Sequence, residues 1–164
     1  MIPAIAESVS PRIRADEHWP ALMVAATQEV FRVMAGIQAQ HVAAPPGRPS
    51  GNVSALIGLA GAMSAILRVR CSPETTEHVA AKMLGGDAVP EKSACQDAIG
   101  EIANMVAGNF KSKISGLVDA CVLSVPTIVT GDDYEVRRVG KGERIEVCVE
   151  CEGRPVWLIL EISL

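Results

Sequence analysis

The stretch Ser93-Ala-Cys-Gln-Asp-Ala-Ile-Gly-Glu-Ile-Ala-Asn-Met-Val-Ala-Gly-Asn-Phe110 repeats its apolar residues at intervals of three and four positions. The repeating residues are Ile99, Ile102, Ala103, Val106, Phe110 and Ile114. This spacing predicts an amphipathic helix between about residues 93 and 116, with one buried stripe. Ser93 followed three residues later by Gln96 predicts a capping box at its start.

The opposite face of the predicted helix is polar and carries Asp97, Glu101, Asn104, Gly108 and Lys111. Glu101 and Asn104 are three residues apart, so a carboxylate and a carboxamide share one side of the rod. A glycine inside a helix costs roughly 0.5 to 1 kcal/mol relative to alanine, so Gly108 indicates that something approaches closely there. Taken alone, the pair is also compatible with an ordinary solvated face.

A second copy of the pattern lies upstream, where residues 29–36 (EVFRVMAG) align without gaps with residues 101–108 (EIANMVAG). The sequence predicts a first helix over His18–Gln38, with an apolar side formed by Leu22, Ala26, Val30, Val33 and Ile37. In this copy Arg32 replaces the amide. Because a guanidinium only donates hydrogen bonds, whereas a carboxamide also accepts them, the sequence predicts one site and not two.

Length and composition favour one domain over residues 1–164, with residues 1–13 as a variable N-terminal segment. Hydrophobic residues make up 49% and aromatic residues 3%, so the core must be aliphatic. A net charge of -4 without a basic run disfavours nucleic acid and anionic membranes as partners. The sequence shows no membrane segment or secretion signal, and five cysteines form no tight framework, which favours the cytoplasm.

The remaining segments predict strands and one short helix. Residues 43–51 read as a connector, residues 53–71 as a hairpin around Gly61, and Ser72 as the cap of a helix ending near residue 84. Strands are predicted at 121–125, 144–151 and 155–164, the last two joined at residues 152–153. This order predicts an α+β fold with helices packed on an antiparallel sheet.

In the last hairpin, the alternation of apolar and polar residues predicts that Cys148 lies on the solvent-exposed face of its strand. Trp157 and Ile159 fall on a face where other residues must shield them from water, for example those of a second subunit. Cys148 and Cys151 have the spacing of a metal or redox site, but strand residues three apart point to opposite faces. No further cysteine pair or histidine cluster completes a zinc set, and Asp132 and Asp133 read as part of a turn. A thiol or metal switch at the two cysteines remains an alternative.

Residues 97–109 (DAIGEIANMVAGN) resemble the signature helix of the CheC/CheX/FliY family of chemotaxis phosphatases. The CheX branch of that family keeps Glu-x-x-Asn in the second copy only, and Arg32 fits this pattern. Residues 53–69 and 125–131 are similar to the family's first hairpin and to the segment after its active helix. The resemblance implies a CheX-like domain of internally duplicated helix–hairpin units.

The resemblance also implies a function: hydrolysis of the phospho-aspartate of a CheY-like response regulator. Asn104 would hold a water in line with phosphorus, and Glu101 would pair with the regulator's active-site lysine. Asp97, Gly108 and Lys111 would contact the partner. The chain itself would bind no cofactor, because Mg²⁺ belongs to the regulator. A homodimer formed by sheet extension is implied, with residues 156–164 as the expected edge. The alternative is a non-catalytic adaptor that binds a receiver or flagellar-switch protein.

Overall fold

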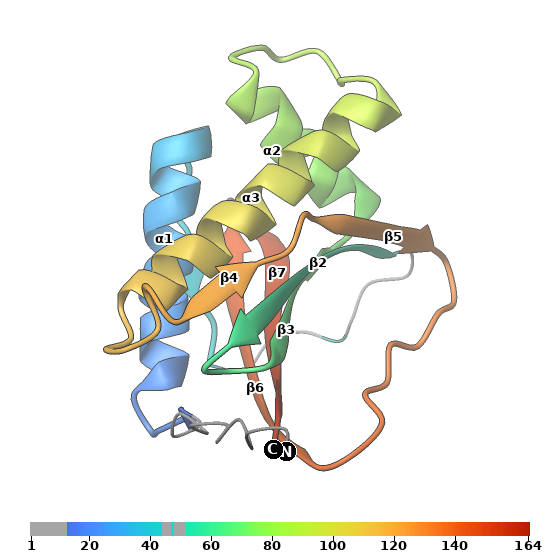
Figure 1. Ribbon diagram of the computed structural model, residues 1–164. Helices are drawn as coiled ribbons and strands as arrows, with labels where there is room; N and C mark the ends of the chain where they lie inside the picture. Colours follow the sequence, from blue (N-terminus) through green and yellow to red (C-terminus); the bar gives the residue numbers. More distant parts are fainter. Residues whose placement is uncertain (1–12, 44–46, 48–51) are drawn as a thin grey trace, which may run out of the picture.

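The computed structural model describes residues 13–43, 47 and 52–164, and it has three helices and seven strands in that part of the chain (Figure 1). In chain order these are α1 (Trp19–Ala35), β1 (Gln40–His41), β2 (Asn52–Gly61), β3 (Ala65–Cys71), α2 (Pro73–Met83), α3 (Lys92–Ser112), β4 (Cys121–Leu123), β5 (Thr127–Gly131), β6 (Gly142–Cys151) and β7 (Arg154–Ser163). Within this part of the chain, no helix is long and apolar enough to cross a membrane.

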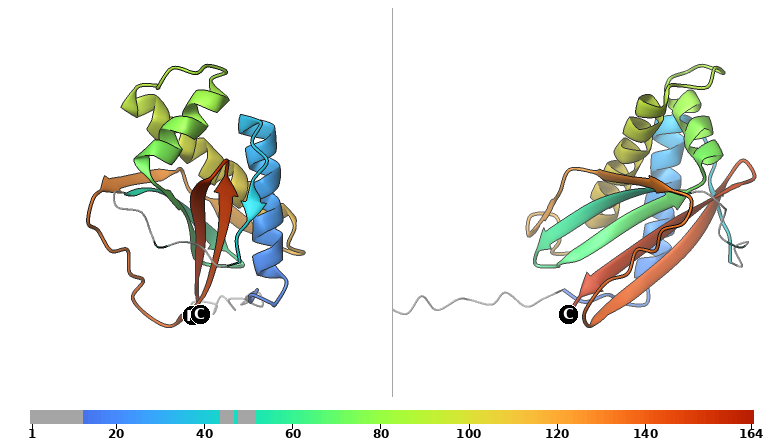
Figure 2. Two further views of the ribbon diagram at one scale, coloured as in Figure 1. Left: turned by 180° about the vertical axis from the view of Figure 1, so that it is seen from behind. Right: turned by 90° about the vertical axis from the view of Figure 1, so that its right-hand side faces the viewer.

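The strands form one antiparallel sheet in the order β1-β6-β7-β3-β2-β4, with β5 also paired to β2. Both β4 and β5 run along β2, where β4 pairs with residues 59–61 and β5 with residues 52–56. The helices pack against one face of this sheet (Figure 2). The predicted α+β class, with helices on an antiparallel sheet, is confirmed.

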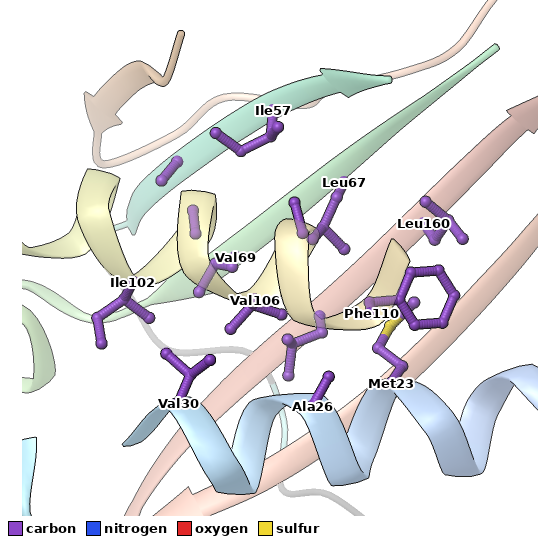
Figure 3. Close-up of a cluster of buried hydrophobic side chains, with 14 of the residues drawn as sticks. Met23, Ala26, Val30, Ile57, Leu67, Val69, Ile102, Val106, Phe110 and Leu160 are labelled. Carbon is purple, nitrogen blue, oxygen red and sulfur yellow. The ribbon is translucent and has the colours of Figure 1, made fainter. Parts of the chain in front are cut away.

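The core lies between the sheet and the helices α1 and α3, which run side by side (Figure 3). Side chains of Met23, Ala26 and Val30 from α1 meet Ile102, Val106 and Phe110 from α3 above the strand residues Ile57, Leu67 and Leu160. The rings of Trp19 and Phe110 meet edge to face, with centroids 5.6 Å apart. This packing holds α3 in a fixed orientation, because its buried stripe is fully enclosed.

Phe110→Ala should lower the free energy of unfolding by about 3 to 5 kcal/mol, because it removes a fully buried ring and leaves a cavity against Trp19. Urea denaturation followed by circular dichroism measures the change. Val33→Ala is the control, since the Val33 side chain is 64% exposed and its truncation should alter stability by less than about 0.5 kcal/mol. Equal losses in the two variants would contradict this assignment of the core.

The predicted hairpins β2–β3 and β6–β7 and the cap of α2 are confirmed. The Ser72 hydroxyl accepts a hydrogen bond from the Thr75 backbone amide, as an N-cap residue does. The predicted strand at 121–125 is shorter, and β5 is an additional strand. Most of the predicted connector at 43–51 lies outside the described residues.

Two details of the helix predictions are wrong. The N-cap of α3 is Glu91, without a side-chain hydrogen bond, so Ser93 lies inside the helix and forms no capping box with Gln96. Val33 was expected on the apolar side of α1, but it faces solvent. The buried stripe of α1 instead passes through Trp19 and Phe31, because both large rings belong to the main hydrophobic core.

The expectation of a wet face at Cys148 is also wrong. Cys148, Trp157 and Ile159 are at most 2% exposed and form a second, smaller apolar cluster with Val42. The chain after β1 runs along β6, where the Val42 amide donates a hydrogen bond to the Cys148 carbonyl. Trp157 and Ile159 are therefore covered within the chain and need no second subunit.

The strand expected at the sheet edge lies in the interior. β7 pairs with β6 on one side and with β3 on the other, so residues 156–164 cannot extend the sheet to another chain. The outer positions of the described sheet belong to β1 and to β4 with β5. The homodimer remains a prediction, and the edge first assigned to it is wrong.

Candidate functional site

The polar face of α3 forms a ridge, which we define by Asp97, Glu101, Asn104 and Gly108, and which faces away from the core. Glu101 is exposed and Asn104 is half-buried. Within the described residues, neither side chain has a hydrogen-bond partner or an ion pair, so both polar heads are available to another molecule. The core packing of α3 fixes the backbone that carries them.

The chain crosses one flank of the ridge between β4 and β5, and sequence reasoning did not assign this segment to the site. A Cβ atom placed on the buried Gly100 would lie 3.4 Å from Cβ of Pro126 and 3.5 Å from Cδ1 of Ile128. Because residues 100 and 104 are neighbours on the helix surface, the crossing lies beside Asn104. Val125 in this crossing is 81% exposed. The sequence signal was Gly100, a second glycine in the helix whose close neighbour only tertiary structure identifies.

Gly108 has open space around it. Among the described residues, a Cβ atom at this position would have only Cδ1 of Leu123 within reach, at 4.0 Å. Packing within the described part of the chain therefore does not demand a glycine here. Lys111, in contrast, is engaged inside the chain: its Nζ donates a hydrogen bond of 2.5 Å to the Cys121 carbonyl and ties β4 to α3. The docking roles of Asp97, Gly108 and Lys111 remain predictions.

The corresponding pair on α1, Glu29 and Arg32, differs in its contacts. The carboxylate of Glu29 accepts a hydrogen bond from Nζ of Lys113 at 3.1 Å, whereas Glu101 has no such contact with any residue that the structure describes. Hydrogen bonds from Asn109 and Lys113 hold the pKa of Glu29 below its usual range. Arg32, in the place of the amide, is exposed. The two copies therefore differ in the availability of their carboxylates as well as in the second residue.

Cys148 and Cys151 point to opposite faces of the sheet, as their spacing in a strand predicted. Cys151 belongs to the main core and Cys148 to the smaller cluster. Burial raises the pKa of Cys148 to about 11 and that of Cys151 to about 12, so both thiols are protonated at neutral pH. In residues 13–43 and 52–164, no group of three or more His, Cys, Asp or Glu side chains is placed to hold a metal ion.

A cavity of about 380 Å³ lies between the start of α2, the start of α3 and β5. Its walls include Pro73, Thr76, Lys92, Gln96 and Thr130, and none of the ridge residues lines it. The ridge is thus separate from this cavity. An outward-facing helix face suits a macromolecular partner better than a small ligand, which binds in concave sites.

Helices packed on one face of such an antiparallel sheet form a fold that is shared with CheX- and CheC-like chemotaxis proteins. The fold is similar to that of the chemotaxis protein CheX from Vibrio vulnificus, with a TM-score of 0.77 and 21% identity over 92% of this chain and 100% of that one. It is also similar to a CheX–CheY–BeF3–Mg²⁺ complex from Borrelia burgdorferi, with a TM-score of 0.70 and 20% identity over 92% and 100% of the two chains.

At the level of sequence, residues 53–150 match the family described as chemotaxis phosphatase CheX. The chain is 26% identical over 139 residues to the CheY-P phosphatase CheX of Thermotoga maritima, which covers 79% of this chain and 86% of that protein. The chain belongs to the CheX family of chemotaxis phosphatases.

Proposed function

We propose that this chain hydrolyses the phospho-aspartate of a CheY-like response regulator and so ends a chemotaxis or other two-component signal. The observation that carries the proposal is the pair Glu101 and Asn104, which have no partner among the described residues and lie on a helix that the core holds rigid. Membership of the CheX family supports it, as does the name of the Thermotoga maritima relative, a CheY-P phosphatase.

In the proposed reaction, the carboxamide of Asn104 orients the attacking water. An amide can accept a hydrogen bond from the water and also donate one, which fixes the direction of a lone pair toward phosphorus. The water oxygen bonds to phosphorus as the bond to the aspartyl oxygen breaks. One water proton passes to a phosphoryl oxygen, so that dihydrogen phosphate and a free carboxylate result. Positioning suffices for such a step, since phosphoryl transfer depends mainly on alignment and on stabilisation of charge.

Glu101 has a different role in the proposal. Its exposed carboxylate lies about one turn before Asn104 and pairs with the regulator's active-site lysine, which aligns the helix with the phosphoryl group. The Mg²⁺ ion that neutralises the phosphoryl oxygens sits on the regulator, and this chain supplies no ligand to it. Gly108 lets the regulator's backbone approach α3, while Asp97, Lys111 and the crossing between β4 and β5 border the contact.

The direct test adds the purified chain to phosphorylated receivers from the same genome, with Mg²⁺ present, and follows the release of inorganic phosphate. For at least one receiver, release should be faster than spontaneous hydrolysis and should scale with the amount of chain added. Binding to a receiver with unchanged phosphate release would contradict the proposal and would favour the adaptor alternative.

A further inference from the structure

The contact between Glu29 and the end of α3 joins two helices outside the core. Lys113 Nζ lies 3.1 Å from Glu29 Oε2, and the two side chains are 28% and 46% exposed. Both residues are exposed, so the pair can orient the two helices but adds little to overall stability. The side chain of Asn109, on the same side of α3, also acts on this carboxylate and lowers its pKa. Two polar groups of α3 thus face one carboxylate of α1.

The contact also lies close to the ridge. Asn109 directly follows Gly108 and is five residues beyond Asn104 on the same helix. At 1.5 Å per residue, about 7.5 Å along the axis separates them. The crossing between β4 and β5 supports the flank of α3 near Gly100, and the contact with Glu29 supports the flank toward α1. The ridge is thus braced from both sides.

We propose that Glu29, Asn109 and Lys113 form an interhelical clasp that holds the ridge of α3 in the orientation needed for hydrolysis. This inference rests on the proposed function. Glu29 is then a positioning residue, acting through α3 on Asn104 without touching the regulator. In this proposal, the carboxylate of the first copy aligns α3 and takes no part in the chemistry.

Glu29→Ala should lower kcat about tenfold while KM changes less than about twofold, because a misplacement near 1 Å is enough to slow an aligned reaction. Amide hydrogen exchange should become faster over residues 101–113 in the unbound variant. Glu29→Gln should retain most of the rate, since its amide oxygen still accepts a hydrogen bond from Lys113. Glu17→Ala, which removes an exposed carboxylate just before α1, is the matched control and should match the wild type.

A charge exchange sharpens the test. Glu29→Lys should be as slow as Glu29→Ala, and the added substitution Lys113→Glu should return kcat to within about twofold of the wild type by restoring the pair in reverse. A raised KM with an unchanged kcat, or no recovery in the exchanged variant, would overturn the proposal, because Glu29 would then contact the regulator directly. If the wild type releases no phosphate, the proposed function fails, and hydrogen exchange alone decides whether the clasp restrains α3.

The clasp also predicts that the first copy, on α1, cannot become an active site by a single substitution. Arg32→Asn rebuilds the Glu-x-x-Asn sequence on α1, yet Glu29 stays engaged by Lys113 and Asn109. In an Asn104→Ala background, this substitution should therefore restore no phosphatase activity. Any recovery above the rate of Asn104→Ala alone would overturn the assignment of Glu29 to the clasp.

Discussion

Asn104→Ala is expected to slow the catalysed release of phosphate by about 100-fold or more, close to the spontaneous rate of the phosphorylated regulator. The variant keeps α3 but loses the amide that aligns the water, and loss of one positioned polar group costs about this much in comparable sites. Asn104 has no hydrogen-bond partner among the described residues, so folding should be unaffected. Affinity for the regulator should change far less than the rate.

Gln96→Ala is the matched control for Asn104→Ala, because it removes a half-buried carboxamide from the same helix, away from the ridge. It should leave both kcat and KM near their wild-type values. Single-turnover decay of the phosphorylated regulator, measured at saturating amounts of each variant, separates chemistry from docking. An unchanged rate for Asn104→Ala would rule out the role assigned to its amide.

Glu101→Ala is expected to weaken binding to the regulator and to lower the rate as well, each by about tenfold or more. Removing one member of a charge pair that becomes buried on docking leaves the other member unpaired, and that costs about 2 to 5 kcal/mol in measured interfaces. Binding is followed with a regulator trapped in its phosphorylated state by a phosphoryl analogue, and the rate by phosphate release.

Two further variants show whether the effect of Glu101→Ala comes from the lost charge at this position. Glu101→Gln keeps the shape and removes the charge, so it should resemble Glu101→Ala if an ion pair is involved. Glu91→Ala removes an exposed carboxylate from the start of the same helix and should bind normally. A tight and active complex of Glu101→Gln would contradict the pairing with lysine.

The site helix could be predicted from the sequence because the information lies within one segment. The spacing of Ile99, Ile102, Val106 and Phe110 defines the buried stripe, and the same periodicity puts Glu101 and Asn104 on the other side. Equally local geometry, the alternation of a strand, argued from the sequence against a metal site at Cys148 and Cys151. The comparison of Arg32 with Asn104 likewise needed only aligned residues.

Tertiary structure alone decided which segments meet. Nothing local to Trp157 reveals that its strand lies in the interior of the sheet and that the chain near Val42 packs on the same cluster. Two contacts join segments that are far apart in the sequence: Pro126 lies against Gly100, and Lys113 forms an ion pair with Glu29. Periodicity reports which face of an element is apolar, because that depends on backbone geometry within the element. It cannot report what covers the face, because that depends on how distant elements pack to exclude water.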